Sequence, residues 1–147
     1  MLRIVIILGC VVSLASAAKA QVNPGDLKWG PAPPNLPPGS EMAVLAGDPT
    51  KPGVFVARAK LPPGYKVPPH HHPTDEYVTV LSGDLTYGMG DKFDTTKGHA
   101  MNAGGFFQAA ANMNHYVWSK SGAVIQFSAE GPFAIIYVNP ADDPTKR

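Results

Sequence analysis

Short runs with alternating apolar and polar positions recur along the chain from residue 42 onward. Side chains of an extended strand point alternately to two faces, so a period of two predicts strands that are buried on one side. The predicted strands cover residues 42–45, 54–59, 77–81, 85–89, 105–108, 116–119, 124–128 and 133–138. Because no stretch has a convincing helical period, the pattern predicts an all-β sandwich or barrel.

Glycine, proline and aspartate separate these runs, as expected for turns. One of these predicted turns is Ser82-Gly83-Asp84, between the third and fourth predicted strands. Residues 21–40 are rich in proline and glycine, which excludes a helix and predicts an extended or polyproline-like arm along the surface. We expect Trp29 to pin this arm to the domain.

The first residues have the layout of a secretory signal peptide. Arg3 precedes an apolar run over residues 4–14, and small residues follow as far as Ala18-Lys19-Ala20. The run is too short for a membrane span, so residues 1–20 are expected to be a signal peptide, and the protein is expected to be secreted or periplasmic. A lipid anchor at Cys10 is the less favoured alternative, because the apolar run before it is short.

Composition restricts the chemistry of the mature chain. Cys10 is the sole cysteine, so after cleavage no disulfide, thiolate ligand or thiol nucleophile remains. Without Arg3 and Lys19, 10 basic residues stand against 11 acidic ones, a net charge of about −1. This balance favours neither nucleic acid nor an anionic membrane as a partner. Any metal ion would have to be held by histidine and carboxylate.

The stretch GYKVPPHHHPTDEYVTVLSG, residues 64–83, carries the strongest chemical signal. In an extended chain His70 and His72 project to one face and His71 to the other. Glu76 returns close to the two imidazoles. Two histidines and one carboxylate on a single wall suit divalent Fe, Mn, Ni or Cu. Taken alone, the three histidines are also compatible with a solvated surface loop.

The spacing of the same stretch decides between these interpretations. Gly64, His70, His72, Glu76 and Gly83 fit the pattern G(x)5HxH(x)3-4E(x)6G at every fixed position. The sequence therefore resembles the first motif of the cupin superfamily.

The second cupin motif, G(x)5PxG(x)2H(x)3N, is matched only in part. Gly104 and His115 occupy their places, whereas the proline, glycine and asparagine places hold Ala110, Asn112 and Ser119. Asparagine tolerates a positive φ better than most residues, so Asn112 is a reasonable substitute for glycine. Alanine does not supply the rigidity of proline, which puts the tightness of the turn before His115 in question.

The resemblance implies a cupin double-stranded β-helix, a conical antiparallel β-barrel, over residues 41–140, with a C-terminal tail at 141–147. It also implies one divalent metal ion (Fe, Mn, Ni, Cu or Zn) held by His70, His72, Glu76 and His115. The implied partner is a small-molecule substrate or ligand. A homodimer is plausible, because cupins often dimerise and because an open sheet edge can pair with a second chain.

Other candidates are weaker. His71 is expected to be exposed or to lie behind the site. His99 is expected on a surface loop, and would replace His115 if that residue were not a ligand. Gln126 lies in an apolar strand, where an inward amide would need a partner, so it is a candidate to bind a ligand.

Three functions remain open on this evidence. The first is a metalloenzyme, either a dioxygenase-like enzyme for a small enolic or phenolic substrate, with Glu76 as proton acceptor, or an isomerase or lyase. The second is a non-enzymatic module that binds a small molecule or metal. The third is a structural cupin without metal.

Overall fold

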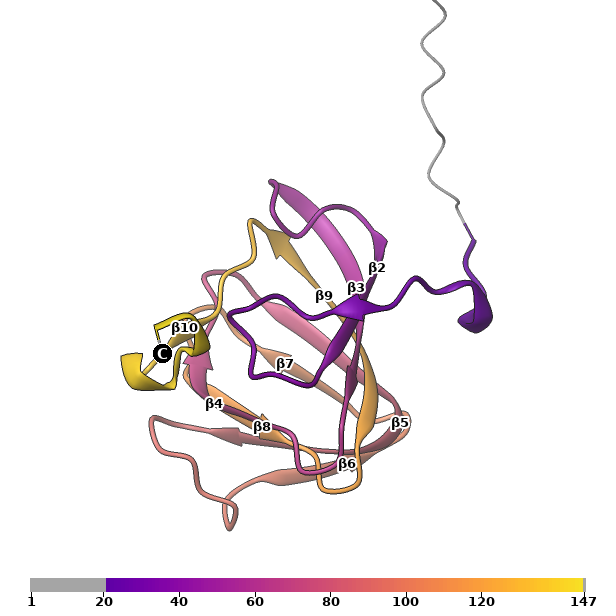
Figure 1. Ribbon diagram of the computed structural model, residues 1–147. Helices are drawn as coiled ribbons and strands as arrows, with labels where there is room; N and C mark the ends of the chain where they lie inside the picture. Colours follow the sequence, from indigo (N-terminus) through magenta and orange to yellow (C-terminus); the bar gives the residue numbers. More distant parts are fainter. Residues whose placement is uncertain (1–20, 147) are drawn as a thin grey trace, which may run out of the picture.

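The computed structural model describes residues 21–146. Ten strands and three 3-10 turns make up the described chain (Figure 1). The turns are η1 (Pro24–Asp26), η2 (Pro140–Asp142) and η3 (Pro144–Lys146). The strands are β1 (Gly30–Pro31), β2 (Glu41–Ala46), β3 (Gly53–Leu61), β4 (Lys66–His71), β5 (Glu76–Met89), β6 (His99–Asn102), β7 (Phe106–Ala109), β8 (His115–Trp118), β9 (Ala123–Gly131) and β10 (Ile136–Tyr137).

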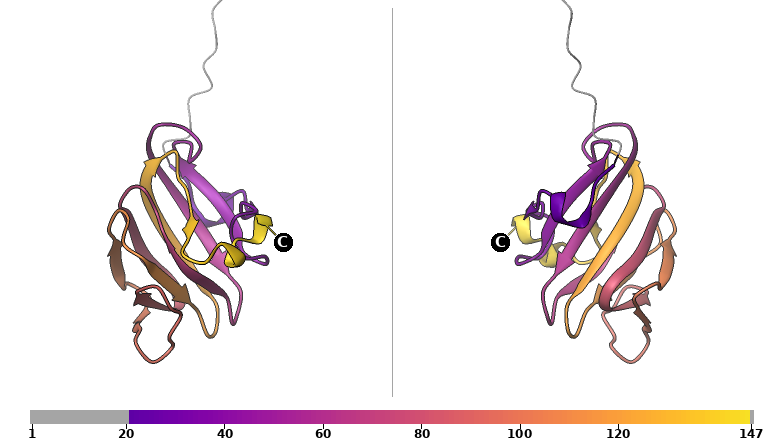
Figure 2. Two further views of the ribbon diagram at one scale, coloured as in Figure 1. Left: turned by 90° about the vertical axis from the view of Figure 1, so that its left-hand side faces the viewer. Right: turned by 90° about the vertical axis from the view of Figure 1, so that its right-hand side faces the viewer.

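The strands pair antiparallel throughout, in the order β1-β2-β3-β9-β5-β8-β4-β10, with β6 and β7 also on β5. The first half of β5 pairs with β9 and β7, and its second half pairs with β8 and β6. The long strand β5 therefore passes from one sheet to the other. Figure 2 shows the two layers edge-on. The prediction of an all-β barrel is confirmed.

The predicted turn at Ser82-Gly83-Asp84 is wrong, because these residues lie inside β5. The register with β9 shifts between Val80 and Ser82, as at a β-bulge. Gly83 has a φ of 78°, and a Cβ there would collide with the backbone of Gly122. Glycine thus supplies a turn-like conformation that bends the strand without ending it.

The remaining predicted strands differ from those of the structure mainly in the short strands. Five predicted ranges overlap β2, β3, β7, β8 and β9, whereas 133–138 shortens to the two residues of β10. β4 and β6 lie outside the predicted ranges. In β4 the register with β8 is interrupted between Val67 and His70, where two prolines lack the donors that a ladder needs.

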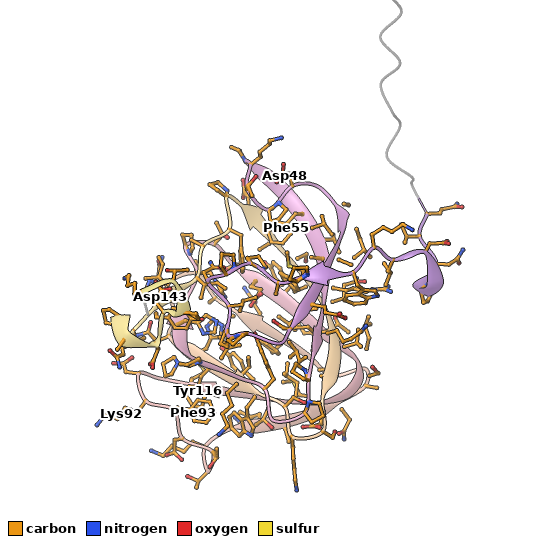
Figure 3. All side chains as sticks on the ribbon, viewed as in Figure 1. Asp48, Phe55, Lys92, Phe93, Tyr116 and Asp143 are labelled. Atoms are coloured by element: carbon orange, nitrogen blue, oxygen red, sulfur yellow. The ribbon has the colours of Figure 1, made fainter. Side chains whose placement is uncertain are left out.

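Apolar side chains from both layers meet between the sheets and form the core. Phe55, labelled in Figure 3, is fully buried on β3. Its ring makes edge contacts with Phe127, at 5.8 Å between centroids, and with Phe133, at 5.3 Å. A second cluster of Phe93, Tyr116 and Trp118 packs on the outside of β8. The inner core continues towards the histidines described below.

The part of the predicted arm that follows η1 crosses the barrel, whereas η1 itself projects away from it (Figure 1). The crossing part is held at several points. Trp29 is half-buried, with the Lys60 ammonium 4.6 Å from its ring centroid. The hydroxyl of Tyr137 donates to the carbonyl of Asn35 at 2.8 Å, and that of Tyr65 donates to Pro37 at 2.6 Å. The exclusion of helix is wrong at η1, where a proline at the first position favours a single turn.

The predicted signal peptide, residues 1–20, lies outside the described residues. Within residues 21–146, no helix has the length and apolar character needed to cross a membrane.

Candidate metal centre

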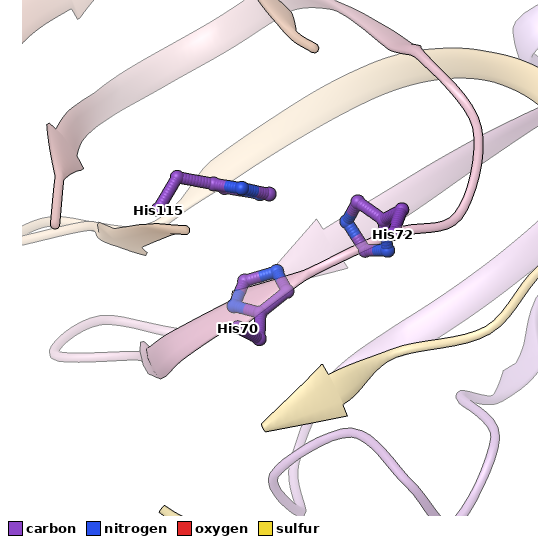
Figure 4. A group of neighbouring side chains, drawn as sticks. All are labelled: His70, His72 and His115. Atoms are coloured by element: carbon purple, nitrogen blue, oxygen red, sulfur yellow. The ribbon is translucent and has the colours of Figure 1, made fainter. Parts of the chain in front are cut away.

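Three histidines, two from neighbouring strands and one that directly follows a strand, meet at one point inside the barrel. His70 lies near the end of β4, His72 follows that strand directly, and His115 begins β8. The antiparallel pairing of β4 with β8 sets His70 opposite His115. One ring nitrogen from each residue lies within 4.8 Å of the other two. Figure 4 shows the three rings gathered around a common space.

Backbone carbonyls fix the orientation of all three rings. The Nδ1 atoms lie 2.7 Å from the oxygen of Pro68 for His70, 2.8 Å from Ala134 for His72 and 3.0 Å from Met113 for His115. A carbonyl only accepts, so each Nδ1 must carry a proton, and in the neutral ring the lone pair is on Nε2. This is the tautomer in which an imidazole binds a metal through Nε2.

Burial opposes a charge on these rings. It lowers the pKa of His70 well below its ordinary value, and the neighbouring His115 and His72 lower it further. The pKa of His115 is also lowered, chiefly by burial. Burial acts in the same direction on His72, but Glu76 and the carbonyl of Ala134 outweigh it and raise that pKa. Neutral imidazoles, which are the ligand form, are therefore favoured at His70 and His115.

Glu76, at the start of β5, lies beside the group of three histidines and contacts one of them. Its Oε2 lies 3.4 Å from Nε2 of His72, and its side chain is 13% exposed. At this separation the two atoms are in electrostatic contact, but the buried Nε2 atom of His72 makes no hydrogen bond of good geometry among the described residues. A buried polar atom without a partner is costly, and a bound cation would satisfy it. Three imidazoles and one carboxylate fit a divalent first-row metal ion.

The turn before His115 is held despite its departure from the cupin pattern. Asn112 adopts a φ of 61°, as expected for a residue in a glycine position. Its backbone N–H donates to the carbonyl of His72 at 2.8 Å. Ser119, in the asparagine position, is buried and accepts from the N–H of Gly122 at 2.9 Å. The hydrogen bond from Asn112 ties the two histidine segments together directly.

A cavity of about 70 Å³ adjoins the histidines. Glu76 and the three imidazoles provide its polar wall, and Tyr65 has its hydroxyl bonded to Ser40 and Pro37. Aliphatic and aromatic side chains form the remaining wall. Among the described residues that line it there is no lysine, arginine, serine, threonine, asparagine or glutamine.

The other candidate residues lie away from this cavity. His71 points elsewhere and its Nδ1 contacts Oδ1 of Asn114 at 2.9 Å. His99 is exposed as expected, but it begins β6 and does not lie in a loop. The hypothesis that Gln126 binds a ligand is wrong: its Oε1 accepts from Arg58 Nε at 3.1 Å, while its neighbours Ile125 and Phe127 line the cavity.

Sequence reasoning missed two residues at the site. The ring of Phe133 stacks on His72 with 4.4 Å between centroids, and Leu36 of the arm lines the cavity. Both lie far from the histidines in sequence. Their apolar character is shared with many core residues, so the sequence contains no signal that places them here.

Solved structures with this fold define its class. The polyketide cyclase RemF from Streptomyces resistomycificus is 15% identical, with a TM-score of 0.66 over 86% of this chain and 89% of that one. KdgF from Halomonas sp. is 16% identical, with a TM-score of 0.56 over 74% and 91%. An RmlC-like cupin from Shewanella frigidimarina is 11% identical, with a TM-score of 0.59 over 76% and 90%. The fold is that of the cupin superfamily.

The sequence itself places the chain more closely. The family described as "Domain of unknown function (DUF4437)" matches residues 18–136, and the chain belongs to that family. No protein with a curated description matches it.

Proposed function

We propose that this protein binds one divalent metal ion through His70, His72, His115 and Glu76. The observation that carries the proposal is the convergence of one ring nitrogen from each of three histidines, whose Nδ1 atoms each lie within hydrogen-bonding distance of a backbone carbonyl. Such preorganisation lowers the cost of assembling a ligand set around an ion.

We further propose that the protein is a dioxygenase-like enzyme that acts outside the cytoplasm on a small enolic or phenolic substrate. When bound, the metal would supply a Lewis acid and, if redox-active, electron-transfer capacity. The apolar wall excludes bulk water from the reacting groups. Glu76 lies at the polar end of the cavity, where its carboxylate accepts the proton that an enol or phenol loses on binding.

Metal analysis of protein prepared without a histidine tag tests the first step. We expect stoichiometric metal in the wild type and its loss in His72→Ala. His71→Ala is the matched control, because it removes a neighbouring imidazole that lies outside the cluster, and we expect it to retain the metal. Equal retention by His72→Ala and His71→Ala would contradict the proposed site. Circular dichroism verifies that both variants are folded.

Oxygen uptake tests the second step, with the iron-, nickel- or copper-loaded protein and either a small β-diketone in its enol form or catechol as substrate. We expect turnover that Glu76→Gln abolishes. Stoichiometric metal with ligand binding but without oxygen uptake in any metal form would instead identify a non-enzymatic binding module.

A further inference from the structure

A second cavity lies behind the wall of the first one. It has a volume of about 140 Å³ and adjoins the arm and the core phenylalanines. Four side chains line both cavities: Leu36, Phe127, Phe133 and Ile135. The two spaces therefore share a wall that these apolar groups form. Asn35 and Thr50 are the polar residues among the described lining of the second cavity.

The sizes of the two cavities complement each other. An apolar cavity of roughly 150 Å³ accommodates a benzene molecule, so the second cavity matches a small ring or a short alkyl chain. The histidine cavity, at about 70 Å³, has room for a small oxygen-containing group but not for such a body. A ligand that filled both would have its polar end at the histidines and its apolar end behind Phe133.

Leu36 is the residue of the partition that lies in the arm. Phe127 belongs to β9, and Phe133 is stacked on His72 and bonded through its N–H to the carbonyl of Pro49 at 2.8 Å. Leu36 belongs to the arm and pairs with no strand, and its N–H donates to the carbonyl of Pro33, within the arm itself, at 2.9 Å. Hydrogen bonds to the carbonyls on either side, those of Asn35 and Pro37, hold it across the opening.

We propose that the two cavities are compartments of one ligand site, that Leu36 separates them, and that the ligand has an oxygen-donor head and an uncharged apolar body. The oxygen donor reaches the histidine end, and this part rests on the proposed metal binding. The second compartment offers no cation for an anionic group among its described lining. Hydroxyl-rich and doubly charged molecules are thus disfavoured, since burying their polar groups without partners costs free energy.

Calorimetry on the zinc-loaded protein tests this with acetate, butanoate, hexanoate and octanoate. Zinc uptake is measured first. In the wild type the Kd should fall by about fourfold for each added methylene, as expected for complete burial, until the chain reaches Leu36. Adipate, which is hexanoate with a second carboxylate, should bind at least about tenfold more weakly than hexanoate.

Substitutions at Leu36 should change the accepted length in opposite directions. In Leu36→Ala the Kd should keep falling with each added methylene for longer chains than in the wild type, while the Kd of acetate is unchanged. In Leu36→Phe the Kd should stop falling at a shorter chain than in the wild type. Leu45→Ala, a half-buried leucine of β2 outside both described linings, should behave like the wild type.

The outcomes separate the two proposals. Failure of the wild type to take up zinc would overturn the proposed function, and this inference with it. Normal zinc uptake with no dependence on chain length, or with adipate equal to hexanoate, would overturn this inference alone. If Leu36→Ala lowered the Kd of acetate and of octanoate by the same factor, the substitution would have opened the arm without joining the two compartments. That result would also overturn this inference.

Discussion

Tyr65 connects the arm to the barrel through one buried oxygen atom. Its hydroxyl lies 2.6 Å from the carbonyl of Pro37 and 2.8 Å from Oγ of Ser40. The carbonyl can only accept, so Tyr65 donates to Pro37 and Ser40 donates to Tyr65. Tyr65→Phe removes this oxygen and keeps the ring, which is 5% exposed. The substitution therefore isolates the two hydrogen bonds from the packing of the aromatic ring.

The expected cost follows from what remains after the substitution. Two hydrogen bonds worth about 1 kcal/mol each are lost, and the Pro37 carbonyl and the buried Ser40 hydroxyl lose a partner, so we expect about 2 kcal/mol of unfolding free energy. Combined with Ser40→Ala in a double-mutant cycle, the coupling energy should be about 1 kcal/mol. Tyr77→Phe is the matched control: Tyr77 is 43% exposed and should change stability by less than about 0.5 kcal/mol.

Urea unfolding followed by circular dichroism measures the global effect, and amide hydrogen exchange over residues 32–38 measures the arm. If the arm unfolds together with the barrel, both readouts should change by the same free energy. Equal stability of Tyr65→Phe and Tyr77→Phe would refute the reasoning. Faster exchange in the arm with unchanged global stability would show that the arm detaches on its own and that water then satisfies the Pro37 carbonyl.

Three further predictions concern the bend in β5, the turn beside it and the metal. Gly83→Ala should destabilise the protein by about 3 kcal/mol or prevent folding, measured by urea unfolding, because φ is positive and the Cβ meets the Gly122 backbone. Asp84 accepts from the N–H groups of Lys120 and Ser121, and chiefly its hydrogen bonds with Ser121 lower its pKa. A lowered pKa stabilises the fold above the unfolded-state value, so Asp84→Asn should cost about 1 kcal/mol at neutral pH, and the difference should vanish in unfolding curves as the pH falls below about 4. Metal ion at about a hundredfold its Kd should stabilise the wild type by about 2.7 kcal/mol in thermal unfolding, with no effect on His72→Ala.

The sequence predicted best what depends on local spacing. The alternation of apolar residues located the strands, and the two-residue spacing of His70 and His72 put their side chains on one face. The resemblance to the cupin pattern brought in His115, which the fold places opposite His70. Glycine misled the prediction at Gly83, because the same positive φ serves a tight turn and a bulge inside a continuous strand. Gln126 misled it too, since the face to which a strand residue points depends on register.

The parts of the site that could not be predicted are those set by distant backbone. The carbonyls that orient His70 and His115 belong to Pro68 and Met113, two residues earlier in each case, so those rings are oriented by the chain immediately before them. The carbonyl that orients His72 belongs to Ala134, in the same segment as the Phe133 ring stacked on it. His72 therefore depends on the position of the segment between β9 and β10. That segment also forms part of the partition behind which the second cavity lies. A ligand that displaced Phe133 would disturb the orientation of His72, whereas a ligand that displaced Leu36 would not. This difference is a physical reason to expect the arm to be the side of the wall that moves.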